Sequence, residues 1–206
     1  MAVHSTALDE RRGRGVWMRP GAAARALRDA ARKALATTEA GLSLMRPILE
    51  QHAAERGHAL GPDHLDTLAA ENELALADLA DDQPGAALDR LTVLAADCER
   101  ALGHDHPDTL VVRGNLAAAR LALGQSGVAA AELAALVVDR ERVLGNGHAS
   151  THNARIELAL ARFAAGRPTT AVEPLESVLV SVDARYGSRH PLSRLCRTML
   201  AEARSA

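Results

Sequence analysis

Hydrophobic and polar positions along this chain follow a helical period, and the whole pattern recurs in blocks of 42 residues. Glycines keep this step at Gly61, Gly103, Gly145 and Gly187. Histidines keep it at His64, His106, His148 and His190, and a hydroxyl residue follows each by three positions, at Thr67, Thr109, Thr151 and Ser193. At this offset, residues 60–101 and 102–143 are identical at 20 of 42 positions. A fixed period without insertions predicts a tandem-repeat protein.

Each 42-residue unit is predicted to contain two helices. In the first unit, the apolar spacing favours one helix over residues 65–80 and a second over 85–101, with a polar break between them. We expect each second helix to end at a glycine in the left-handed helical conformation. The stretch 106–109 is typical of a helix start, because Pro107 suits the first turn and Asp108 favours the positive end of the helix dipole.

Small residues recur where paired helices must approach each other closely. Those of the predicted first helices are Ala75, Ala117 and Ala159, and each follows a leucine. Those of the second helices are Ala87, Ala129 and Ala171, and each is followed four residues later by a leucine. Since one helix pair cannot bury its apolar stripe alone, the spacing predicts antiparallel pairs stacked into a solenoid.

Composition narrows the fold and the classes of function. The chain has 206 residues, including 44 Ala and 30 Leu but one each of Trp, Tyr and Phe, so an all-β fold is excluded. The net charge of −2 argues against a nucleic-acid-binding protein, and no apolar run is long enough to span a membrane. The isolated Cys98 and Cys196 indicate no disulfide framework, which favours a cytoplasmic protein.

These units resemble the tetratricopeptide repeat (TPR) family, in the 42-residue form of kinesin light chains and many bacterial proteins. The residues that carry the resemblance are LGPDHLDTLAAENELA (60–75), LGHDHPDTLVVRGNLA (102–117) and LGNGHASTHNARIELA (144–159). It implies an all-α, right-handed superhelical solenoid of antiparallel helix pairs. Glu71, Arg113 and Arg155 stand where the family often has Trp, and the alignment turns the two arginines toward the neighbouring helix.

The repeat pattern predicts the organisation of the whole chain. We expect a flexible N-terminal arm over 1–20, a degenerate helix pair over 21–59, repeats over 60–101, 102–143 and 144–185, and a C-terminal capping helix over 186–206.

The repeated histidines do not predict a metal site. Equivalent positions in stacked repeats lie roughly 10 Å apart, whereas coordination needs about 2 Å. We expect these histidines to hydrogen-bond the inter-repeat turns.

Cys98 lies between Asp97 and Glu99, whose charges disfavour the thiolate that a nucleophile requires. The sequence therefore predicts a protein that is not an enzyme, with no catalytic residues, metal or cofactor.

The resemblance implies a protein-interaction scaffold, because first helices in the family line a concave groove that binds a peptide or helix of a partner. By alignment, the candidate peptide-binding residues are Asn72, Glu73, Leu76, Asn115, Glu157, Leu160 and Phe163. A solvated helix face is the alternative interpretation of the same positions. Two carboxylates and no cation at the aligned polar positions predict a neutral or basic ligand segment.

Self-association is the alternative function that the sequence leaves open. The last predicted helix, residues 192–204, carries Leu195, Met199 and Leu200. If the preceding repeat does not cover this apolar face, it would form the contact of a homodimer.

Overall fold

The computed structural model describes residues 46–206, which form helices joined by short loops. The helix pairs are α2 (Leu65–Ala80) with α3 (Pro84–Leu102), α4 (Pro107–Ala122) with α5 (Ser126–Leu144), and α6 (Ala149–Ala164) with α7 (Val172–Tyr186). Residues 46–60 are helical and precede α2, and α8 (Pro191–Ser205) ends the chain. The all-α repeat fold is as predicted. The expected arm and the first helix of the degenerate pair lie outside the described residues.

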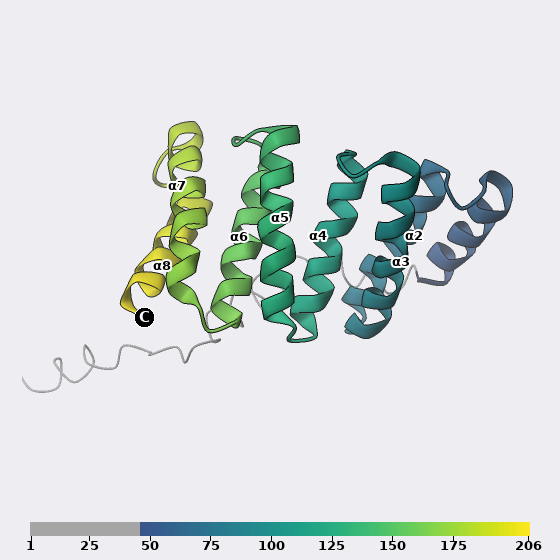
Figure 1. Ribbon diagram of the computed structural model, residues 1–206, viewed down its shortest axis with the longest axis horizontal. Helices are drawn as coiled ribbons and strands as arrows, with labels where there is room; N and C mark the ends of the chain where they lie inside the picture. The colour runs from purple at the N-terminus through teal and green to yellow at the C-terminus, as the bar shows by residue number, and fades with distance from the viewer. Residues whose placement is uncertain (1–45) are drawn as a thin grey trace, which may run out of the picture.

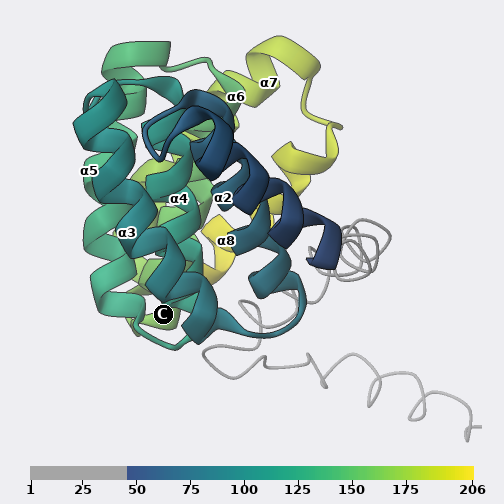
Figure 2. The ribbon, with the colours of Figure 1, turned by 90° about the vertical axis from the view of Figure 1, so that its right-hand side faces the viewer.

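The helices lie side by side in chain order along the long axis of the molecule (Figure 1). Seen from the end, α3 and α5 lie on one side and α2, α4 and α8 on the other (Figure 2). Across repeats, α2 packs against α4 and α4 against α6, so the first helices approach one another more closely than the second helices do. We call the surface formed by α2, α4, α6 and α8 the first-helix face.

Each first helix begins at a histidine that acts as its N-cap. Nδ1 of the histidine accepts a hydrogen bond from the backbone N–H two residues later, over 3.1 Å at His64 and 3.3 Å at His190. The hydroxyl three residues after the histidine donates to the carbonyl of the loop glycine, over 2.9 Å from Thr109 to Gly103. The same two bonds recur in all four loops. The recurring Gly, His and Thr thus form one turn structure, which confirms the predicted role of the histidines.

The loop glycines adopt positive φ angles, but the predicted left-handed helical conformation is wrong. Gly103 has φ 93° and ψ 161°, and Gly145 and Gly187 have nearly the same angles. This region of backbone space is essentially restricted to glycine. It arises because the chain must leave the helix and enter an extended N-cap histidine, as at His106 with φ −65° and ψ 137°.

We expect Gly103→Ala to lower the free energy of unfolding by at least ~1 kcal/mol, measured by urea denaturation. An added Cβ at Gly103 meets nothing within 4 Å, so the loss would come from backbone strain alone. Gly85→Ala is the matched control, because Gly85 is equally open but lies in the first turn of α3. There alanine should be neutral or stabilising. If both changes altered the free energy of unfolding equally, the loss at Gly103 could not be assigned to backbone strain.

The core repeats with the helices. Three clusters of buried residues each join one helix pair to the next first helix. The recurring alanines are all 0% exposed: Ala75, Ala87, Ala117, Ala129, Ala159 and Ala171. This confirms that the small residues mark the places where helices pack closely.

The second helix of the third pair starts differently from its equivalents. A 3₁₀ turn, η1 (Pro168–Ala171), precedes α7. Pro174 has no N–H, and in a continuous α-helix its ring would clash with the carbonyl of Thr170. The Arg162 guanidinium donates to that carbonyl instead.

Candidate functional site

Two of the predicted ligand-contacting residues meet across neighbouring repeats. The side-chain amide of Asn115 on α4 donates a hydrogen bond to Asn72 Oδ1 on α2, with an N···O distance of 2.8 Å. Both side chains are half-buried, and Glu73 beside Asn72 is exposed. Each carboxamide retains further hydrogen-bonding capacity. The junction of α2 and α4 therefore offers polar groups that a peptide backbone could bind.

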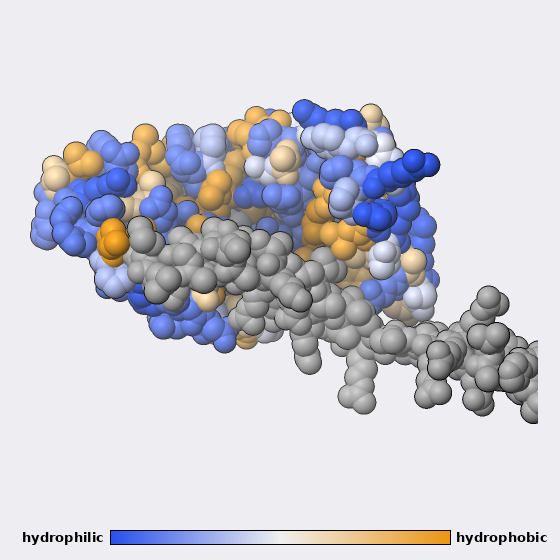
Figure 3. Space-filling view, turned by 180° about the vertical axis from the view of Figure 1, so that it is seen from behind, coloured by the Kyte–Doolittle hydropathy of each residue, from blue (hydrophilic) through white to orange (hydrophobic). Residues whose placement is uncertain are grey.

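A cavity of about 140 Å³ opens at this junction. Asn72 and Glu73 form its polar edge, and Leu65, Ala69 and Val111 contribute apolar walls. Leu65 is 47% exposed and Val111 43% exposed, although both are large and apolar. These two residues were not predicted as anchors from the sequence. Figure 3 shows hydrophobic side chains among hydrophilic ones on the side of the molecule opposite to that seen in Figure 1.

The three predicted apolar anchors are less exposed to a ligand than Leu65 and Val111 are. Leu76, Leu160 and Phe163 are half-buried. Leu160 and Phe163 pack against the buried cluster that α6 forms with α7 and α8. Their apolar surface is therefore partly used within the fold, whereas Leu65 and Val111 remain exposed.

A buried arginine lies between the second and third repeats. Arg140 on α5 is 6% exposed and donates hydrogen bonds of 2.9 Å to the backbone carbonyls of Leu110 and Ser150. Gly114 makes room for it, because a Cβ at Gly114 would lie 2.9 Å from Arg140 Nη2. The guanidinium thus joins α4, α5 and α6.

The environment of Glu157 differs from that of Glu73, because the positive charge of Arg140 acts on the Glu157 carboxyl group. Burial raises the pKa of Glu157 to about 7, and the positive charge of Arg140 opposes this shift. The equivalents of Arg140 in the other repeats are Cys98 and Val182. Alignment of first-helix positions alone does not reveal this cation, because it comes from a second helix.

We expect Glu157→Gln to stabilise the protein at pH 8. Glutamate titrates near 4.3 in an unfolded chain, so the folded state binds the extra proton between there and about 7. The free energy of unfolding therefore falls as pH rises through this window, and glutamine avoids the loss. The full difference in pKa corresponds to about 3–4 kcal/mol, and partial exposure of the carboxyl reduces the expected gain to on the order of 1–2 kcal/mol at pH 8. The gain should be close to zero at pH 4, and urea denaturation measures both values. Glu73→Gln is the control, since Glu73 is exposed. A gain independent of pH would contradict the assignment.

Two arginines of the first helices point away from the first-helix face, as predicted. Arg113 Nη1 lies 2.8 Å from Asp139 Oδ2, and Arg155 Nη2 lies 2.8 Å from Glu141 Oε1. Asp139 and Glu141 both belong to α5. These ion pairs join each first helix to a second helix.

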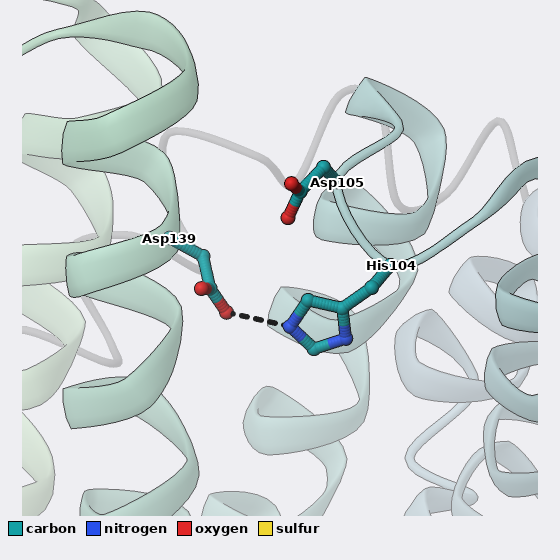
Figure 4. Close-up of side chains that lie close together, drawn as sticks. All are labelled: His104, Asp105 and Asp139. Carbon is teal, nitrogen blue, oxygen red and sulfur yellow. Dashed lines mark hydrogen bonds and ion pairs between the residues drawn. The ribbon is translucent and has the colours of Figure 1, made fainter.

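His104, Asp105 and Asp139 have ligand atoms within 4.8 Å of one another, the spacing of a metal site (Figure 4). His104 Nε2 lies 3.0 Å from Asp139 Oδ2. However, Arg113 bonds that same oxygen over 2.8 Å, and Arg142 bonds both Asp105 and Asp139. A divalent cation here would face two guanidinium groups, so we interpret the group as an ion-pair network.

The environment of Cys98 does not favour a nucleophile. Its side chain is 1% exposed. Burial raises the pKa of the thiol to about 11, and the charges of Asp108 and Asp97 act in the same direction. The reactive thiolate is therefore disfavoured near neutral pH.

The fold and its repeated loops define the class: an all-α solenoid of tandem helix pairs. The chain is similar to crystal structures of the nearly identical TPR-like repeats of a kinesin light chain from Podosopora anserina. One, a variant with a single substitution, has 30% identity and a TM-score of 0.73, covering 88% of this chain and 84% of that one. The other has 29% identity and a TM-score of 0.72, covering 91% and 87%. No protein-family model and no curated protein matches. This chain belongs to the TPR-like repeat family.

Proposed function

We propose that this protein is a non-enzymatic interaction scaffold that binds a peptide or helix of a partner protein on its first-helix face. The TPR-like fold implies protein partners in general. The observation that carries the proposal is the α2–α4 cavity, where exposed Leu65 and Val111 lie beside Asn72. Asn72 in turn accepts a hydrogen bond from Asn115 on α4. Apolar walls with a few polar groups are typical of binding sites.

The charges at this cavity favour a neutral or basic ligand segment. Glu73 and Asp108 line the cavity and are exposed. Neither forms an ion pair with an arginine among the described residues. An acidic ligand would place like charges together there, which costs binding energy. Glu157 contributes less to this preference, because it is half-buried and Arg140 acts on it.

Selection from a random peptide display library would test both the site and its preference. We expect selected peptides to be neutral or basic with an apolar residue. Glu73→Lys should weaken the binding of a basic peptide at least fivefold at low salt, where screening is least. Asp89→Lys is the control, since it makes the same charge change at an exposed position on α3.

Three outcomes of the selection would reject the proposed groove. They are enrichment of acidic peptides, equal binding by Glu73→Lys and the unchanged protein, and equal weakening by Asp89→Lys. Enrichment of acidic peptides would contradict the charge preference assigned to this groove. Either of the two results with the lysine variants would mean that the selected peptides do not bind beside Glu73 at the α2–α4 cavity.

Self-association through α8 has weaker support than peptide binding. Met199 is 2% exposed and Leu200 4% exposed, and both belong to the cluster that α8 forms with α6 and α7. Only Leu195 of the predicted apolar face remains half-exposed. Light scattering at high protein concentration should therefore show a monomer.

The proposed scaffold would act in the cytoplasm. Cys98 and Cys196 are both free and buried, which suits a reducing compartment. Among the helices that the structure describes, none has the length and apolar character needed to cross a membrane.

A further inference from the structure

A second cavity, of about 540 Å³, lies at the junction of α6, α7 and α8. It is bounded by the start of α6, the end of α7 and the start of α8. It occupies the same place in its repeat as the α2–α4 cavity does 84 residues earlier, since Tyr186 corresponds to Leu102 and Val182 to Cys98. The two cavities are therefore equivalent in position but are lined by different side chains.

The largest difference is a buried histidine where the other repeats have leucine. His152 lines the α6–α7–α8 cavity and corresponds to Leu68 and Leu110. Its side chain is only 5% exposed, and its Nε2 is buried without a hydrogen-bond partner. An unsatisfied buried polar atom costs free energy, which a bound group could recover.

The remaining polar groups of this cavity are mostly donors. His148 and His190 line it, and each accepts a backbone hydrogen bond at Nδ1. When neutral, each must therefore carry its proton on Nε2, which makes Nε2 a donor. The N-terminal ends of α6 and α8 also favour negative charge nearby.

The cavity is also positively charged. Arg185 lines the cavity and forms no ion pair with the described residues. Its Cζ atom lies 5.5 Å from the centre of the Tyr186 ring. The Tyr186 ring stacks on the His190 ring, with the two ring centres 4.9 Å apart. Among the residues that line the cavity there is no Asp or Glu. Burial lowers the pKa of His152, and the charges of Arg155, Arg185 and His148 lower it further, with only the Asn146 carbonyl opposing.

We propose that this cavity binds an oxyanion, the carboxylate or phosphate group of a ligand. Arg185 supplies the positive charge, and Nε2 of neutral His148 and of neutral His190 supplies a hydrogen-bond donor. Nε2 of His152 becomes a donor when the ring takes up a proton from solvent, which a bound anion favours. Val182 and Leu192 provide apolar walls for the part of the ligand that carries the anion. The site is separate from the α2–α4 cavity, so it can be tested without a peptide.

Titrations with sodium acetate and with inorganic phosphate, followed through the histidine ring signals in NMR, would test the site. Ionic strength is held constant with sodium chloride. We expect saturable shifts of the His152 signals. Saturation by acetate would assign a carboxylate, saturation by phosphate a phosphate group, and saturation by both an oxyanion site of broad specificity. Shifts that do not saturate with either anion would overturn the proposal.

Variants that copy residues of the other repeats make the test specific. His152→Leu installs the residue of the equivalent positions Leu68 and Leu110, and Arg185→Ala installs that of Ala101. Each should weaken anion binding at least tenfold, with binding to His152→Leu followed through the His190 signals. Arg189→Ala is the control, because Arg189 is exposed but does not line the cavity. Arg185 is also exposed, so its replacement should leave folding intact, and unchanged affinity in Arg185→Ala would show that the proposal is wrong.

Discussion

Gly114→Asn is expected to lower the free energy of unfolding by about 3 kcal/mol or more. Asparagine occupies the equivalent position in the first repeat, at Asn72, and suits a helix better than glycine. In this context, however, its Cβ would lie 2.9 Å from Arg140 Nη2. The guanidinium would have to leave the carbonyls of Leu110 and Ser150, and its buried charge would lose these hydrogen bonds.

Arg140→Cys provides the second half of a double-mutant cycle. Cysteine is the equivalent residue of the first repeat, Cys98, so the double variant recreates the pair found there. We expect it to be more stable than the sum of the single changes by about 1–3 kcal/mol. Urea denaturation at pH 5, below the pKa of about 7 of Glu157, keeps that carboxyl protonated when its cation is removed. Strictly additive effects would contradict the steric link between positions 114 and 140.

Ala129→Leu should cost about 1–3 kcal/mol. Ala129 is 0% exposed and belongs to the cluster in which α4, α5 and α6 pack together, so three added carbons have no space. Because repeats couple mainly to their neighbours, thermal unfolding should also broaden and depart from a two-state transition.

Ala131→Leu is the matched control for this change. Ala131 lies two residues further along α5 and is exposed, so the same substitution there should leave the melting curve nearly unchanged. Equal curves for Ala129→Leu and the unchanged protein would show that Ala129 does not pack between helices.

The fold was predictable because each repeat supplies independent signals for the same structure. The first helix predicted over 65–80 has the observed bounds, since a histidine cap and a polar break mark its two ends. The late start of α7 was not predicted, because the break near residue 168 matched the other repeats. The effect of Pro174 depends on its position relative to the helix start, which the repeat alignment did not consider.

The candidate site was less predictable, because its properties depend on pairs of residues from different helices. Alignment of first helices identified Asn72 and Asn115, which the structure brings together. The same alignment could not show that Arg140 fills the space left by Gly114. Comparing first- and second-helix positions together across the repeats would have revealed that these two residues depart from the pattern in the same unit.

The inter-repeat loops carry a consequence for how such a chain can evolve. The hydroxyl of Thr67 bonds Gly61 and the ring of His64 bonds the N–H of Asp66, so these contacts are all made within seven residues of one loop. No side chain from a neighbouring unit is needed to form the turn. Duplication or deletion of a 42-residue segment therefore leaves a complete loop at each new junction, and selection can act on copy number. The residues between the loops are then free to diverge, as the leucine-to-histidine change at His152 illustrates.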